Sequence, residues 1–218
     1  MSVIFLHTGC GLGLLQTAKT TPKGMLRVSG GGGYLYNANV EDRGPTLGNI
    51  PVQIALRYGV TDSLDVGARL FCLAGGLADI KYNLLSSKSP LALSVWGGIG
   101  AAANVNAGGA KSEGWNLHMP LGAIASYELM GWLTPYVGFS YGFWWIFGRG
   151  GEIDPNVRYA SREGYGDGLL TITAGVELRF GARFALLLEY DLFEPVVDDP
   201  GDFYSFIRSH LVQVGFRY

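Results

Sequence analysis

Few residues of this sequence have the types and spacing that a catalytic site requires. Two of the three histidines, His118 and His210, could act as bases, and Ser209 lies beside His210. A hydrolytic site would need such a base within reach of a nucleophile or an acid. Acidic residues elsewhere could complete one: Glu152, Asp154, Asp198, Asp199 and Asp202. Their spacing matches no catalytic motif, so we predict a non-enzymatic protein and keep a hydrolase as the second alternative.

Metal and cofactor chemistry has no support in the sequence. The two cysteines, Cys10 and Cys72, do not form a disulfide framework, and no cluster of histidine and cysteine has zinc-like spacing. The glycine run Gly30–Gly33 lacks the Gly-Lys-Ser/Thr continuation of a phosphate-binding loop. The net charge of −2 gives no reason to expect a nucleic acid partner. We therefore predict no cofactor, no metal and no nucleic acid.

The composition indicates a membrane protein built from strands. Hydrophobic residues make up 48% of the 218 residues and charged residues only 16%, with 34 glycines and 12 tyrosines. Two charge-free stretches, Ser89–Ala110 and Leu129–Gly148, are long enough for a transmembrane helix. However, they are dense in glycine, and other segments alternate apolar and charged residues with a period of two. A helix would spread those charges around all its sides, so we favour strands.

The last segment shows the alternation most clearly. In Leu211–Tyr218 one face carries Val212, Val214, Phe216 and Tyr218, while Gln213, Gly215 and Arg217 lie opposite. A soluble β-sandwich also alternates and is the main competing fold. Here, however, the strands are about ten residues long, as a tilted transmembrane strand requires. We therefore predict an all-β, antiparallel up-and-down transmembrane β-barrel.

The alternating segments number ten. They are Met25–Tyr36, Ile50–Val60, Leu64–Leu73, Gly76–Leu85, Leu91–Ala103, Trp115–Leu129, Leu133–Phe147, Leu169–Phe180, Arg183–Phe193 and Phe206–Tyr218. Short and long connections alternate between them, as in bacterial outer-membrane barrels with short periplasmic turns and long external loops. The connection Ala74–Gly75 is too short for an external loop, so eight strands are the alternative. Both termini are expected on the periplasmic side.

The aromatic residues support this arrangement. Under it, outward-facing rings gather near both ends of the strands, as in the aromatic girdles of membrane barrels. The predicted girdle residues are Tyr34, Tyr36, Tyr58, Tyr82, Tyr127, Trp145, Phe180, Tyr190, Phe216 and Tyr218.

The C-terminus carries a family resemblance. The end Val214-Gly215-Phe216-Arg217-Tyr218 is similar to the C-terminal strand of small outer-membrane β-barrel proteins of Gram-negative bacteria, which ends in an aromatic residue. The resemblance implies that the barrel-assembly machinery recognises this strand during biogenesis. The residues involved would be Val212, Val214, Phe216 and Tyr218. It also implies outer-membrane lipid as a partner, and it suggests an assembly route rather than an activity.

The N-terminal segment, residues 1–24, is interpreted separately from the barrel of residues 25–218. The run Leu6-His7-Thr8-Gly9-Cys10 resembles the end of a bacterial lipoprotein signal, in which Cys10 would be lipidated. His7 departs from that pattern, and the signal is short. A signal remnant with an incidental cysteine is the alternative. In either case Gly11–Gly24 is expected to be a periplasmic tether outside the barrel.

The inward-facing residues bear most on function. Opposite charges are predicted to line the lumen: Arg27, Arg57, Asp65, Arg69, Asp79, Lys81, Glu128, Glu177, Arg179, Glu189, Asp191 and Arg217. In a narrow barrel they should pair across the lumen, because an unpaired buried charge is unfavourable. Inward glycines would leave local room for water. We therefore predict a charge-filled barrel that acts as a structural anchor, or as a surface-binding protein through its external loops. A narrow, porin-like solute or ion pore is the first alternative, and a hydrolase at the external rim is the second. The sequence identifies no protein partner.

Overall fold

Ten β-strands make up the described part of the chain. The structure is a computed structural model that describes residues 14–37, 51–71, 75–85, 89–103, 113–149, 166–181, 183–196 and 209–218. The strands are β1 Leu26–Asn37, β2 Val52–Gly59, β3 Leu64–Phe71, β4 Gly75–Asn83, β5 Leu91–Ala103, β6 Glu113–Tyr127, β7 Leu133–Arg149, β8 Gly166–Phe180, β9 Phe184–Val196 and β10 Ser209–Arg217. Each overlaps one of the ten predicted segments.

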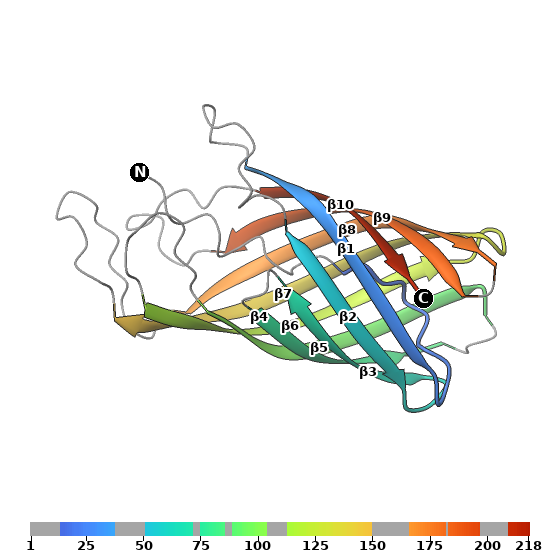
Figure 1. Cartoon of the computed structure of the whole chain (residues 1–218), viewed down its shortest axis with the longest axis horizontal. Helices are drawn as coiled ribbons and strands as arrows, with labels where there is room; N and C mark the ends of the chain where they lie inside the picture. Colours follow the sequence, from blue (N-terminus) through green and yellow to red (C-terminus); the bar gives the residue numbers. More distant parts are fainter. Residues whose placement is uncertain are drawn as a thin grey trace.

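The strands form a closed barrel. Each strand pairs antiparallel with its neighbours in the sequence, and β10 pairs with β1, so the sheet has no free edge (Figure 1). The pairing of β3 with β4 runs from Leu64 opposite Tyr82 to Phe71 opposite Gly75. The short connection between these strands therefore joins a true hairpin, and the eight-strand alternative is wrong. The predicted ten-stranded antiparallel barrel is confirmed.

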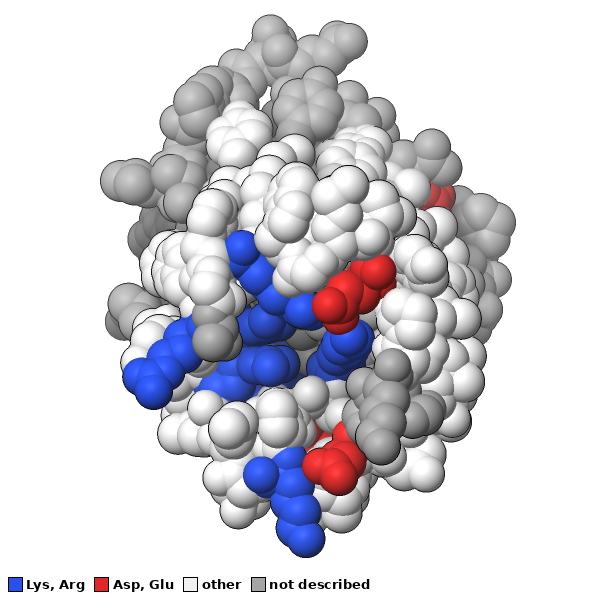
Figure 2. Space-filling model, turned by 90° about the vertical axis from the view of Figure 1, so that its right-hand side faces the viewer, with Lys and Arg blue, Asp and Glu red and all other residues white. Residues whose placement is uncertain are grey.

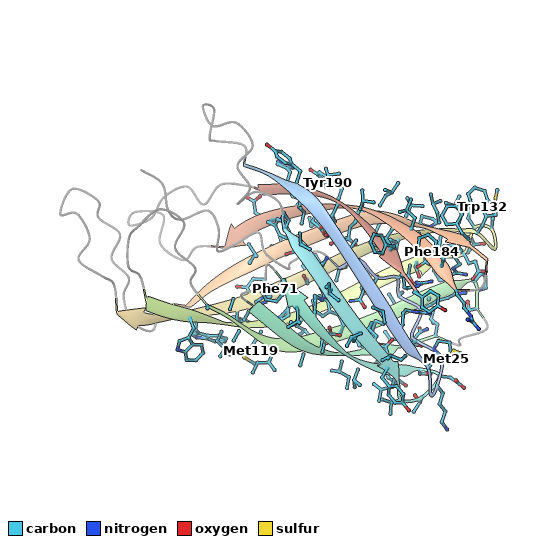
Figure 3. All side chains as sticks on the ribbon, viewed as in Figure 1. Met25, Phe71, Met119, Trp132, Phe184 and Tyr190 are labelled. Carbon is cyan, nitrogen blue, oxygen red and sulfur yellow. The ribbon has the colours of Figure 1, made fainter. Side chains whose placement is uncertain are left out.

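The outer surface of the barrel is apolar. In β2, for example, Val52, Ile54, Leu56 and Tyr58 are exposed, while the alternate positions are buried or half-buried. The side chains in Figure 3 show the same arrangement, with Met119 and Tyr190 projecting away from the wall. Water-soluble proteins rarely expose contiguous apolar patches larger than several hundred Å². Because this apolar surface recurs on every side of the barrel, it is the surface of a protein that spans a lipid bilayer.

The two ends of the barrel differ in their connections. Residues 60–63, 84–90, 128–132 and 181–183 connect strands at the end where Tyr218 lies, to the right in Figure 1, which we call the short-turn end. The longer connections, together with residues 72–74, join strands at the opposite, long-loop end. The predicted external loops, at Asn37–Asn49, Gly148–Gly168 and Glu194–Ser205, lie mostly outside the described residues. No helix among the described residues is long and apolar enough to cross a membrane.

The segment before β1 does not lie where the sequence suggests. Residues 14–21 are inside the barrel, where all except the half-buried Lys19 are buried. The segment then turns at Pro22 and Gly24 into β1, and the backbone NH of Gly24 donates to the carbonyl of Gly59 at 2.8 Å. We call residues 14–21 the luminal arm. The expectation of a tether outside the barrel is therefore corrected for this segment.

Candidate functional site: the barrel lumen

One group of inward charges lies on β2, β3 and β4. The guanidinium of Arg57 lies 2.6 Å from Asp65 and 2.6 Å from Asp79. Arg69 lies 3.6 Å from Asp79, and Lys81 lies 3.6 Å from Asp65. All five side chains are buried. We call this group the Arg57 cluster, and within it three cations share two buried carboxylates.

A second group lies toward the short-turn end. Glu177 on β8 is fully buried and accepts hydrogen bonds from Arg179, at 2.6 Å, and from Arg217 on β10, at 2.8 Å. Arg179 also lies 3.5 Å from Glu128, which in turn accepts a hydrogen bond from Lys19 of the luminal arm. We call these five residues the Glu177 cluster. Glu128 lies in the β6–β7 turn, and the hydrogen bond from Lys19 holds the pKa of its carboxyl below the ordinary value.

The remaining two acids of the predicted network have neutral partners. Glu189 accepts hydrogen bonds from the hydroxyl of Tyr136 at 2.7 Å and from the amide of Gln213 at 2.5 Å. Asp191 accepts from Thr173 at 2.6 Å and from the same Gln213 amide at 2.8 Å. The prediction that every inward acid pairs with a cation therefore does not hold for this pair, because neutral hydroxyl and amide donors occupy the adjacent inward positions.

The luminal arm is hydrogen-bonded to the barrel wall along its length. The NH of Leu15 donates to Glu189 at 2.8 Å, and the NH of Thr21 donates to Asp65 at 2.8 Å. The ammonium of Lys81 donates to the carbonyls of Thr17 and Lys19, each at 3.0 Å. Ala18 adds two contacts, since its NH donates to Ser126 at 3.3 Å and its carbonyl accepts from Ser94. Wall residues from five strands thus form hydrogen bonds with backbone groups of the arm.

Inward glycines make room for the arm. A Cβ atom at Gly138 would overlap the side chain of Leu14, and one at Gly31 would overlap Leu15. A Cβ atom at Gly59 would overlap the carbonyls of Thr21 and Pro22. The space that these glycines leave is therefore filled by protein, and the expectation of water beside them is wrong at these positions.

One small pocket lies in the lumen beyond the arm. A pocket of about 10 Å³ lies among Arg69, Trp96, His118 and Thr171. Such a volume has room for about one water molecule. In Figure 3 Phe71, which is buried, lies inside this part of the barrel. The side chains around this pocket therefore leave little space between them.

Arg27 differs from the other inward cations. Its neighbour directly across the sheet is Arg57, and Arg217 lies two residues along on the other side. Within the described chain its guanidinium has no hydrogen bond or ion pair, whereas every other inward cation has a carboxylate within 4 Å. Arg27 is half-buried. It is the one described lumen cation without an acidic partner.

The histidines do not come together. His118 is buried in the lumen on β6, whereas His210 on β10 faces outward and its ring forms a hydrogen bond with the hydroxyl of Tyr190. The barrel wall therefore separates them. The acidic residues suggested as their partners, Glu152, Asp154, Asp198, Asp199 and Asp202, lie outside the described residues. The same holds for Cys10, Cys72 and the side chain of Tyr36.

The other predicted outward residues lie on the outer face. Exposed rings at the short-turn end belong to Tyr58, Tyr82, Tyr127, Phe180, Phe216 and Tyr218, and those toward the long-loop end belong to Tyr34 and Tyr190, while Trp145 is half-buried. The C-terminal residues Val212, Val214, Phe216 and Tyr218 share this face. Their contact with lipid headgroups and with the assembly machinery stays a prediction. No group of three or more metal-binding side chains occurs among the described residues.

Known proteins resemble this barrel at low sequence identity. No protein-family model and no curated protein matches the sequence. Similar solved structures include the N-terminal β-barrel domain of Pseudomonas aeruginosa OprF, with a TM-score of 0.40, 14% identity, 91% of this chain and 100% of that chain covered. Neisserial surface protein A gives a TM-score of 0.41 at 10% identity, with 88% of this chain and 94% of that chain covered. The attachment invasion locus protein Ail of Yersinia pestis gives a TM-score of 0.34 at 12% identity, with 88% of this chain and 96% of that chain covered. These likenesses concern the barrel fold alone.

Sequence reasoning missed the luminal arm. The residues from Leu14 to Thr21 read LLQTAKTT, which has no clear period of two. Their partners are up to 174 positions away in the sequence. One signal was available, because inward glycines recur at Gly31, Gly59, Gly138 and Gly215, where a filled lumen would otherwise need side chains. Small residues on the inner face indicate that something else occupies the space.

Proposed function

We propose that this chain is an integral bacterial outer-membrane barrel with a closed lumen, which acts as an anchor or as a surface-binding protein rather than as a pore or an enzyme. The observation that carries this proposal is the luminal arm, whose backbone is hydrogen-bonded to opposite sides of the wall at Glu189 and Asp65. The two charge clusters line the lumen around it. Because the arm occupies the middle of the lumen, the parts of the barrel that can bind partners are its two ends.

The topology is part of the proposal. Short turns lie on the periplasmic side in bacterial barrels, and the C-terminal Tyr218 lies at the short-turn end. We therefore place both termini in the periplasm and the long loops outside the cell. The terminal strand β10 would be the assembly signal. Lipidation of Cys10 belongs to the same topology, and intact-mass measurement of protein purified from membranes tests it.

Single-channel recording separates the anchor from the pore. The refolded full chain is inserted into a planar bilayer, and a heat-shifted gel band verifies folding of the same sample. A closed lumen gives no reproducible conductance steps. Steps of constant size from verified barrels would overturn the proposal in favour of a narrow pore.

The hydrolase alternative has a separate test. Because His118 and His210 face opposite sides of the wall, they cannot serve one site. The purified barrel is expected to hydrolyse neither phospholipid nor peptide substrates. Turnover that disappears in His118→Ala or His210→Ala would show that the protein is an enzyme.

A further inference from the structure

The short-turn end contains a cavity that the closed-lumen function does not use. It has a volume of about 500 Å³, within the range of small-molecule sites. Figure 2 looks into this end and shows a hollow whose visible inner surface is largely Lys and Arg. The cavity is bounded by the arm, by β1, β8 and β10, and by the turns near Asp62 and Gly131.

Cations dominate the cavity wall. Lys19, Arg27, Arg179 and Arg217 line it, and the one acidic residue that lines it is Asp62. The carboxylates of Glu128 and Glu177 are already engaged by Lys19, Arg179 and Arg217. Four cations and these three acids leave one positive charge in excess around the cavity.

The lining cation without an acidic partner in the described chain is Arg27. Arg57 lies directly opposite on β2, and Arg217 lies diagonally on β10. Like charges opposite each other in a sheet are unfavourable, and each of the two neighbours has its own carboxylate. Arg27 therefore holds all its guanidinium donors available beside the cavity. A bound anion would supply the missing partner.

The chemistry of the wall specifies the anion. A guanidinium presents a planar fork of NH donors that matches two oxygens of a phosphate or carboxylate, while an ammonium acts as a point charge. Arg27 supplies the free fork, and Arg217 and Lys19 add charge around it. We propose that the short-turn end of the lumen is a binding site for a phosphate-bearing anion, with Arg27 as its principal ligand. Either a small soluble phosphate compound or the phosphate of a lipid headgroup presents this chemistry.

Binding of inorganic phosphate tests the proposal. The refolded full chain in a non-ionic maltoside detergent is titrated with phosphate at constant ionic strength, and bound phosphate is followed by ³¹P NMR. Wild type is expected to bind saturably, and Arg27→Gln is expected to weaken binding at least tenfold. The matched control is Arg183→Gln, an exposed arginine at the same end that does not line the cavity, and it should bind like wild type.

A second variant keeps the test possible if Arg27→Gln does not fold. If Arg27→Gln gives no heat-shifted band, Lys19→Gln replaces a cation that comes from the arm rather than from a strand, and it is also expected to weaken binding. Absence of saturable phosphate binding to the folded wild type would overturn the proposal. So would equal affinity in wild type and in a folded Arg27→Gln variant.

Nanodiscs distinguish the two sources of phosphate. If the ligand is a soluble compound, phosphate binding that depends on Arg27 persists both in phosphatidylcholine and in phosphatidylglycerol nanodiscs. If it is a lipid headgroup, the headgroup phosphates compete, and binding falls in nanodiscs relative to detergent, most strongly in the anionic phosphatidylglycerol. Both results support the site, and they assign its ligand. An Arg27-independent signal in both nanodiscs would contradict it.

Discussion

At the scale of single residues, the lumen compensates its buried charges in two ways. The Arg57 cluster pairs each cation with aspartate, whereas Glu189 and Asp191 rely on hydroxyl and amide donors. Both solutions satisfy the requirement that a buried charge be paired or hydrogen-bonded. The sequence predicted which residues face inward, because alternation decides the face. It could not predict the partners, because these depend on the stagger between strands and on the arm.

Arg57 provides a test of this pairing. Replacing it in Arg57→Met leaves two buried aspartates without their shortest cation contacts. Breaking a buried ion pair by removing one partner typically destabilises a protein by about 3–5 kcal/mol. We expect a loss of that size in the free energy of unfolding, measured by urea titration in lipid vesicles. Lys23→Met, an exposed change at the short-turn end, should have little effect. An equally small effect of Arg57→Met would show that the network contributes little to stability.

Glu128 gives a pH-dependent prediction. Because Lys19 lowers the pKa of this carboxyl in the folded state, its contribution to stability is present above the unfolded pKa of about 4.3 and is lost as the pH falls through the folded value. The side chains are partly exposed, so the contribution is at most about 1 kcal/mol. The difference in stability between wild type and Glu128→Gln should therefore shrink between about pH 6 and pH 3.5. A difference that is constant over this range would contradict the pairing.

At the scale of elements, the strands could be predicted from the sequence, whereas the luminal arm could not. All ten strands could be predicted, since each carries a lipid face and a luminal face in alternation. The tight hairpin between β3 and β4 was the one point that alternation left open, and the register of the two strands settles it. The arm has no lipid face and no strand partner, because it lies inside the lumen. Its position depends on long-range contacts such as that between Leu15 and Glu189, which no local pattern encodes.

The arm can be removed to test its role. A chain that begins after Thr21 lacks the backbone that bonds to Glu189, Lys81 and Asp65. We expect this variant to fold but to show conductance steps in a planar bilayer, because ten strands enclose a wider interior than the eight that side chains just fill. The matched control begins at Leu14 and keeps the whole luminal arm. It should be as silent as the full chain, and steps in both variants would indicate that the arm does not close the lumen.

At the scale of the whole molecule, the two faces of the barrel wall have different requirements. The apolar outer face requires lipid, and the polar inner face requires internal partners, which the arm and the clusters supply. Alternation fixes both requirements at once, because a register slip of one residue would exchange the two faces. The closed β1–β10 pairing then satisfies the backbone at every edge, as the hydrocarbon core demands.

Arginine substitution at two similarly exposed leucines tests where the bilayer lies along the barrel. Leu121, in the middle of β6, is 67% exposed, and Leu26, at the short-turn start of β1, is 64% exposed. A lipid-facing arginine costs about 2–4 kcal/mol at the bilayer midplane but only about 0–1 kcal/mol near the interface. We therefore expect Leu121→Arg to reduce the free energy of unfolding in vesicles by the larger amount and Leu26→Arg to reduce it by the smaller amount. Tryptophan fluorescence during denaturant titration measures both values. Since the two side chains lose similar apolar exposure, the difference reports depth rather than hydrophobicity. Equal effects would mean that the outer face is not graded by a membrane, and the barrel would then have to cover its apolar surface in another way.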